Sequence, residues 1–222
     1  MKARQILAAL RQRGWKIFTR PFELNIIGLR SNITRPNSFD DLVCVFYHDN
    51  AGKAVAHFFP ATTDPGTYWL RQPMNPQGTA ILAQGQYIGA YSLGLHRGQY
   101  LALVESGSVK VVRDYDRDAV LDFANGHEAT GRFGINIHHA RSSGTTTTVD
   151  KYSAGCQVFA DIRDFNSFMG MCHKHRELYG NSFTYSLIDA RAINRSGKKR
   201  LVVVGFAVTM AAIAFSIAAY RD

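Results

Sequence analysis

Residues 201–220, which read LVVVGFAVTMAAIAFSIAAY, form an uncharged run of twenty residues. An α-helix of that length rises roughly 30 Å, which matches the hydrocarbon core of a bilayer. A helix in a soluble core seldom stays apolar on every face over so many turns. Arg200 and Arg221 flank the run and can place their charges among lipid headgroups. We therefore expect a transmembrane helix over 201–220, and hence a single-pass membrane protein whose C-terminal anchor holds it in a lipid bilayer.

Positive charge is concentrated next to that run. The chain carries 26 Lys and Arg against 17 Asp and Glu, a formal net charge of +9. Five of the positive charges fall in the basic juxtamembrane linker 191–200, RAINRSGKKR, which contains no acid. The positive-inside tendency would place the preceding residues in the cytoplasm, whereas simple attraction to anionic lipid would hold the linker on either side. No nucleic-acid recognition motif accompanies the charge, so no nucleic acid is expected as a partner.

Residues 1–22 form a basic amphipathic segment ahead of the main domain. Ala3, Ile6, Leu7 and Leu10 recur on one helical face, and basic residues lie opposite. Arg and Lys interrupt the apolar residues too often for a secretory signal. Such a helix can lie on an anionic membrane surface or pack against the domain, and the sequence leaves both placements open.

The central residues, 23–190, carry short apolar runs separated by frequent turn signals, as a mostly β domain does. The runs rich in β-branched and aromatic residues are expected strands: 24–29, 41–48, 54–59, 67–70, 79–83, 100–105, 109–114, 134–139 and 183–188. One substantial helix is expected between Asp161 and Gly180, where apolar residues recur at helical spacing and Asp164 is a candidate N-cap. The expected fold class is therefore mostly β, a mixed α+β domain with one main helix.

Residues 134–159, GINIHHARSSGTTTTVDKYSAGCQVF, concentrate the groups that can do chemistry. A strand ending in His138 and His139 precedes, across a polar loop, a turn at 153–156 that ends in Cys156. A thiol nucleophile needs a base within reach, a third group that orients the base, and backbone amides for the oxyanion. Positive charge near the turn would lower the pKa of the thiol. The same two residue types also fit a blander account, a buried cysteine and an ordinary polar histidine.

This passage resembles the catalytic region of the L,D-transpeptidases, the YkuD-like cysteine enzymes of peptidoglycan. In that family a strand ending in a histidine precedes an S-x-G-C turn by a similar distance. Upstream, residues 57–70, HFFPATTDPGTYWL, are similar to the family's T-P-x-G-x-[FY] segment. The resemblance covers roughly residues 24–188. It implies an L,D-transpeptidase-like β-sandwich with one main helix after the catalytic cysteine.

The resemblance also implies roles for particular residues. Cys156 matches the nucleophile, His138 the general base, and the backbone carbonyl of His139 the group that orients the imidazole. Ser153 matches the motif serine, and Gly155 together with Cys156 would provide amides for the oxyanion. Covalent catalysis of this kind implies no cofactor and no metal.

The chain departs from the family's pattern beside the cysteine. Gln157 and Val158 stand where the family usually has an apolar residue and then an arginine. Ala154 stands where the family often has His or a small polar residue. The missing arginine removes the family's contact with a substrate carboxylate, so the substrate is less firmly implied than the nucleophile.

The activity implied by the resemblance is that of an L,D-transpeptidase or L,D-peptidase. Cys156 would attack the carbonyl at the L-centre of the third residue of a peptidoglycan stem peptide, usually a diamino acid, and expel D-alanine. An amine or water would then resolve the acyl-enzyme, giving a crosslink or a cleaved stem. The alternative is a non-catalytic peptidoglycan- or membrane-associated binding protein.

The expected location raises a conflict. A peptidoglycan enzyme must work on the peptidoglycan-facing side of the membrane, whereas the basic linker 191–200 predicts a cytoplasmic domain. A bacteriophage-encoded enzyme that acts from a virion membrane, or during lysis, would satisfy both expectations.

Overall fold

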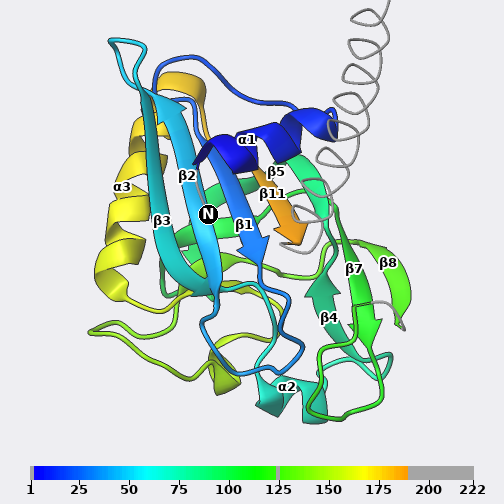
Figure 1. Cartoon of the computed structure of the whole chain (residues 1–222). Coiled ribbons are helices and arrows are strands. Elements are labelled where there is room, and N and C mark those ends of the chain that lie inside the picture. The colour runs from blue at the N-terminus through cyan, green and yellow to red at the C-terminus, as the bar shows by residue number, and fades with distance from the viewer. Residues whose placement is uncertain (1–2, 124–125, 190–222) are drawn as a thin grey trace, which may run out of the picture.

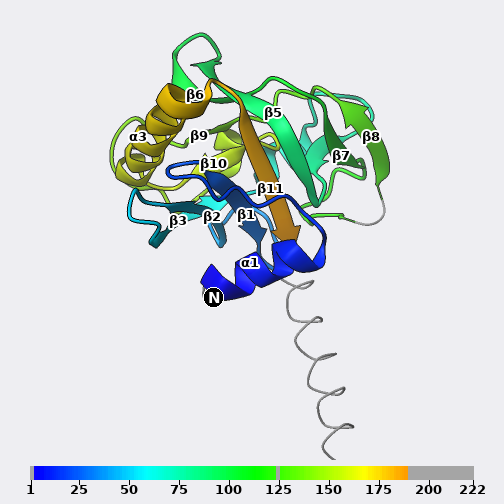
Figure 2. The same ribbon diagram turned by 90° about the horizontal axis from the view of Figure 1, so that it is seen from above.

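The computed structural model describes residues 3–123 and 126–189, which fold into a β-barrel, a small sheet and three α-helices (Figures 1 and 2). The expectation of a mostly β class is confirmed for this part of the chain. In order around the barrel the strands are β1 (Asn25–Arg30), β11 (Phe183–Asp189), β5 (Gly85–His96), β6 (Tyr100–Glu105), β9 (Ile137–His139), β10 (Gln157–Phe159), β3 (Ala54–Thr62) and β2 (Asp41–His48). The small sheet contains β4 (Thr79–Leu82), β7 (Val109–Asp114) and β8 (His127–Gly131).

The barrel closes at β1, which pairs antiparallel with β2 and parallel with β11. The expected sandwich of two packed sheets is therefore replaced by a closed ring in the described strands. Alternating burial along a strand fits either arrangement, and only the choice of pairing partners separates them. Every residue of β1 is buried, because Ile26 faces the barrel core while Ile27 and Leu29 face the helix outside it.

Helix α1 (Ala3–Gln12) covers the outer face of β1, β2 and β11 (Figure 2). Ile6 and Leu10 are at most 1% exposed and belong to one apolar cluster with Ile27 and Ile188. Gly14, at φ 67°, lies in the turn that follows the helix. The apolar face of the N-terminal segment thus packs against the domain, which is one of the two placements the sequence leaves open.

Helix α3 (Ile162–Tyr179) packs its apolar face against β9 and β10. Its N-cap is Asp161, whose side chain accepts a hydrogen bond from the amide of Arg163, so the expectation of Asp164 at this position was wrong. The reason is that β10 ends at Phe159 and the helix starts almost at once, which places Asp164 inside the first turn. Gly180, at φ 86°, ends the helix where the sequence predicts.

Helix α2 (Thr67–Arg71) stands where a strand was expected over 67–70. The amides of Trp69 and Leu70 both donate to the carbonyl of Gly66, which winds the chain into a short helix. Leu70 is the one buried residue of this helix.

None of the helices in residues 3–123 and 126–189 is long and apolar enough to cross a membrane. The expected linker 191–200 and transmembrane helix 201–220 lie outside the described residues.

Candidate active site

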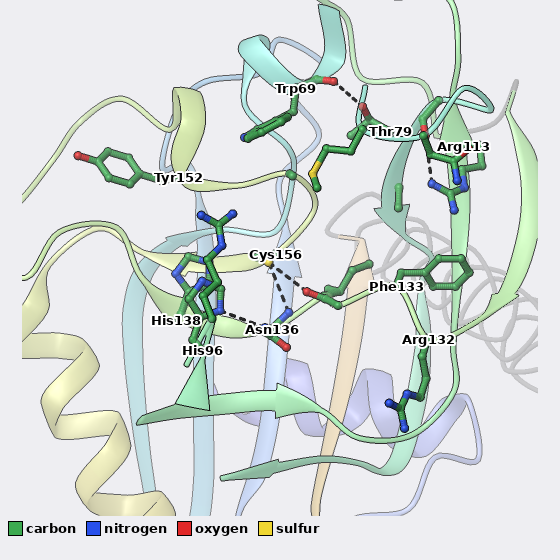
Figure 3. A pocket seen from close by; sticks show the side chains of 18 residues that line it. Trp69, Thr79, His96, Arg113, Arg132, Phe133, Asn136, His138, Tyr152 and Cys156 are labelled. Atoms are coloured by element: carbon green, nitrogen blue, oxygen red, sulfur yellow. Dashed lines mark hydrogen bonds between the residues drawn. The ribbon is translucent and has the colours of Figure 1, made fainter. Parts of the chain in front are cut away.

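A cavity of about 560 Å³ lies where the barrel meets the small sheet, and Cys156 lines it (Figure 3). Its walls come from α2, β4, β7, the β5–β6 turn, the approach to β9 and the turn before β10. The residues that line it are Trp69, Met74, Asn75, Gly78, Thr79, Ala80, His96, Arg97, Arg113, Arg132, Phe133, Gly134, Ile135, Asn136, His138, Tyr152, Ala154 and Cys156.

Cys156 is placed by the parallel pairing of β9 and β10. Val158 lies opposite His138 and Gln157 opposite Ile137, so the residue before β10 comes level with Asn136. The Cys156 Sγ accepts a hydrogen bond from the Asn136 amide at 3.4 Å, and the thiol donates to the Gly134 carbonyl at 3.5 Å (Figure 3). The thiol is therefore held by backbone groups at the cavity wall, partly exposed to the cavity.

His138 lines the same cavity and is oriented by the backbone. Its Nδ1 lies 2.8 Å from the carbonyl oxygen of His139, in the arrangement that the resemblance implies. Because a carbonyl only accepts, Nδ1 carries the ring proton and Nε2 is left as the basic nitrogen. The ring stacks on His96 with centroids 4.1 Å apart, and the side chain is only 4% exposed. The fold thus brings the expected nucleophile and the expected base to one cavity.

Burial makes both groups neutral at pH 7. It lowers the pKa of His138 to about 3, and the neighbouring His96 lowers it further. It raises the pKa of the Cys156 thiol to about 11, although the Asn136 amide and Arg97 oppose that rise. The sequence suggested a thiol pKa lowered by nearby positive charge; the desolvation of the thiolate outweighs that charge here.

Ser153 and Gly155 build the turn that carries the thiol. Ser153 is fully buried, and its Oγ donates to the carbonyl of Cys156 at 2.8 Å and accepts from the amide of Gly155 at 3.2 Å. A Cβ on Gly155, which has φ 122°, would meet the carbonyl oxygen of Ala80 in β4. Ser153 therefore stabilises the turn through two hydrogen bonds, and the Gly155 amide already donates to the Ser153 hydroxyl.

His138 also lines a second cavity, of about 380 Å³. It shares His96, Arg97, His138 and Tyr152 with the first. His138 therefore belongs to the walls of both cavities.

The β5–β6 hairpin supplies site residues that the sequence did not predict. His96 stacks on His138, and its Nδ1 lies 3.0 Å from the Nδ2 of Asn136. Arg97 lies at the tip of the hairpin with φ 51°, a backbone conformation that is costly for a side chain and is found often at functional sites. Gly98, at φ 70°, is the sequence signal for this tight turn, but the strand that precedes it, β5, was not predicted.

The two residues after Cys156 are buried inside the domain. The Gln157 side chain is buried, and its Oε1 accepts a hydrogen bond from the Tyr185 hydroxyl at 2.7 Å. Val158, which is 0% exposed, occupies the position of the family's arginine. That position faces the core, so an arginine there could not reach the cavity.

The two segments that carry the resemblance lie against each other. The Gly66 amide donates to the Ser153 carbonyl at 2.9 Å, and the Trp69 indole donates to the Lys151 carbonyl at 3.0 Å. A Cβ on Gly66 would meet the carbonyl of Asp150, so this contact requires glycine.

The described part of the chain holds no group of three or more His, Cys, Asp or Glu placed to bind a metal ion. Comparisons of the chain with family models, with curated proteins and with solved structures gave no match.

Proposed function

We propose that this chain is a membrane-anchored cysteine enzyme that acts on peptidoglycan stem peptides through an acyl-enzyme on Cys156, as an L,D-transpeptidase or L,D-peptidase. The observation that carries the proposal is the orientation of His138: its Nδ1 is fixed by the His139 carbonyl while the ring lines the cavity that also holds the Cys156 thiol. A nucleophile, a base and a group that orients the base are the minimum for acyl transfer by a thiol.

The first step begins with a neutral thiol and a neutral imidazole. The Cys156 Sγ bonds to the carbonyl carbon of the stem's third residue while its proton passes to Nε2 of His138. The carbonyl oxygen becomes an oxyanion, for which the amide of Cys156 itself is the candidate donor because Ser153 engages that of Gly155. Collapse breaks the bond to D-alanine, which leaves as the amine with the proton from His138.

The second step reverses the proton transfers. An acceptor amine or water attacks the thioester carbon, His138 removes its proton, and Cys156 leaves and regains a proton as the thiol. The two cavities that meet at His138 offer one space for the bound acyl group and another for the acceptor.

The proposal is tested with the full chain in detergent, incubated with purified peptidoglycan and with stem tetrapeptides, and followed by mass spectrometry. We expect release of D-alanine and an acyl adduct on Cys156, both lost in Cys156→Ala, since no other side chain can replace the nucleophile. The matched control is Cys172→Ala, which removes a thiol that is 0% exposed in α3 and should leave turnover within about threefold. Absence of turnover and of any adduct on Cys156 would contradict the proposed enzymatic activity.

One observation favours a second function, a non-catalytic peptidoglycan-binding protein. The thiol pKa of about 11 means that Cys156 is not an activated thiolate in the free protein. If the enzyme test fails, sedimentation of the full chain with insoluble peptidoglycan, unchanged by Cys156→Ala, would identify the binding protein.

The proposed location is a membrane, with the domain on the peptidoglycan-facing side or in a virion membrane. A phage-encoded lysis enzyme would reconcile that side with the basic linker 191–200. Expression of the full chain in bacteria, inside or exported to the periplasm, tests this idea: we expect lysis only on export, and only with Cys156 intact.

A further inference from the structure

The surface formed by α1 and the segment that follows it is basic. Four cations between residues 4 and 16 make up what we call the basic patch: Arg4, Arg11, Arg13 and Lys16. Residues 1–22 contain no Asp or Glu, and none of the four cations forms an ion pair with a carboxylate in residues 3–123 and 126–189. Charge of one sign that the protein leaves uncompensated attracts a partner of the opposite sign.

Helix α1 separates this charge from its apolar residues. Arg4 and Arg11 are seven residues apart, close to two helical turns, so they lie along one side of the helix, and both are exposed. Ala8 lies between them on that side and is exposed as well. Ile6 and Leu10 lie on the opposite side and are buried against β1, β2 and β11. The domain therefore occupies the apolar face, and the basic face is the one that α1 presents to its surroundings.

The other two cations of the basic patch lie where the chain passes from α1 to the outer side of β5. The amide of Lys16 donates to Oε1 of Gln86 at 2.9 Å, and Nε2 of Gln86 donates to the Lys16 carbonyl at 2.8 Å. The guanidinium of Arg13 lies 5.7 Å from the centre of the Trp15 ring, and the ammonium of Lys16 lies 4.9 Å from that of Phe18. Aromatic rings beside basic side chains are typical of segments at a membrane surface.

The acids near the basic patch do not neutralise it. Glu23 pairs with Arg20 at 2.7 Å. Asp41 on β2 is 2% exposed and accepts hydrogen bonds inside the domain. Asp189, which ends β11, forms no ion pair with any of the four cations. The positive charge of the basic patch is therefore available to an external anion.

The described chain ends beside the basic patch. Ile188 of β11 is 0% exposed and belongs to the same apolar cluster as Ile6 and Leu10, and Figure 2 shows the end of β11 next to α1. Residues 190–200, which precede the expected span, carry five more cations and no acid. These eleven residues reach at most about 40 Å, so a bilayer that holds 201–220 lies within that distance of the end of β11.

We infer that the basic patch binds anionic phospholipid headgroups, so that α1 lies along the membrane surface with its apolar face on the domain and its basic face on the lipid. The inference goes beyond the proposed function, because it adds a second membrane contact and does not involve the chemistry of Cys156. Since the apolar face of α1 is buried against the barrel, the contact is electrostatic and weakens as salt rises. The position of the patch beside the expected anchor favours a membrane over a nucleic acid as the anion.

The first test measures vesicle binding by the full chain carrying Met210→Arg and Ile213→Arg, which removes the expected anchor. The vesicles contain equal parts of phosphatidylcholine and phosphatidylglycerol. Arg4→Gln combined with Arg11→Gln should weaken binding about tenfold or more at low salt, because each cation close to an anionic surface adds to the affinity. High salt should abolish the difference. Thermal unfolding checks that this double variant keeps its fold, which both exposed positions favour.

The matched control in the same anchor-free chain is Arg71→Gln combined with Arg176→Gln. It removes the same charge from exposed sites on α2 and α3, which lie apart from α1 in Figure 1, and should change the affinity by about threefold or less. Equal losses in the two double variants would show that net charge alone governs binding and would overturn the inference. A double variant of α1 that loses affinity for duplex DNA, but not for the vesicles, would also overturn it.

The second test locates α1 while 201–220 is intact. A fluorescent donor is attached at Ala8→Cys in the Cys156→Ala chain, where the other two thiols, Cys44 and Cys172, are 0% exposed. The chain is placed in lipid nanodiscs that carry a headgroup-linked acceptor. Energy transfer should be about twofold higher in phosphatidylglycerol discs than in phosphatidylcholine discs, and high salt should remove the difference. A donor at Glu177→Cys, exposed on α3, should report no such difference.

Equal transfer from position 8 in both kinds of disc would overturn the inference. If 201–220 does not hold the chain in the discs, vesicle binding by the anchor-free chain decides it instead. Neither measurement depends on turnover or on an adduct at Cys156, so failure of the enzyme test and failure of the lipid contact are separate results.

Discussion

At the scale of single residues, Cys156 and His138 illustrate how burial sets chemistry. The Asn136 amide lowers the pKa of the thiol, and the His139 carbonyl raises the pKa of the imidazole. Desolvation outweighs both effects, so the pKa of the thiol is raised and that of the imidazole is lowered. A neutral pair of this kind transfers its proton only as the new bond forms, so catalysis requires that the substrate be bound in position first.

Thiol alkylation checks this picture. Below a pKa of about 11 the thiolate fraction of Cys156 rises with pH, so its alkylation by iodoacetamide should accelerate about tenfold per pH unit from pH 7 to pH 10. Cys44 and Cys172 are both 0% exposed and should stay unmodified, and Cys156→Ala provides the blank. A rate that levels off below pH 8 would instead indicate a preformed thiolate–imidazolium pair.

At the scale of elements, the decisive feature is the close approach of the turn before β10 to β4. Gly155 combines a positive φ with a Cα that lies against the Ala80 carbonyl. The loop before β9 contains another glycine with positive φ, Gly134, but nothing lies within 4 Å of its Cβ position. A side chain at position 134 would therefore meet backbone strain alone, whereas a side chain at position 155 would meet backbone strain and a steric clash.

Substitution of the two glycines by alanine tests that distinction. Gly134→Ala should lower the free energy of unfolding by about 1–3 kcal/mol through backbone strain alone. Gly155→Ala should cost at least about 2 kcal/mol more, because strand β4 must also move. Urea unfolding of both variants gives the comparison. Equal losses would show that the turn can relax away from β4.

Strand prediction succeeded where a strand has a local signature and failed where it does not. The expected strands 41–48, 100–105 and 109–114 coincide with β2, β6 and β7. The longest strand, β5, was missed because Gly85, Gly89 and Gly94 interrupt its apolar pattern, with Gly89 at φ 63°. It is stabilised by partners distant in sequence, β11 and β6. Because β5 was not predicted, His96 and Arg97 at its end were not predicted as site residues either.

At the scale of the whole molecule, the expected bilayer anchor over 201–220 remains a prediction. An integral anchor resists both high salt and alkaline carbonate, whereas binding through the linker 191–200 to anionic lipid does not. We expect the full chain to float with neutral phosphatidylcholine vesicles after carbonate extraction. Met210→Arg combined with Ile213→Arg should release it, since each charge at the centre of a span costs about 2.5–3.5 kcal/mol on the insertion scale.

Ser216→Ala is the control for that experiment and should float like the parent chain. Flotation that requires anionic lipid and disappears in high salt would show that the basic linker alone attaches the chain. Flotation unchanged by the double arginine variant would exclude 201–220 as the attachment.

The sequence alone determined the mostly β class, the end of α3 at Gly180, and the candidates Cys156 and His138, because residue propensities, capping and motif spacing act over a few neighbouring positions. Tertiary structure decided the closure of the barrel at β1, the entry of His96 and the arginines into the cavity, and the need for glycine at 155. It also decided the protonation of the thiol. The reason is that strand pairing, burial and the electrostatic surroundings of a side chain depend on contacts between residues far apart in the chain. A local sequence pattern does not predict such contacts.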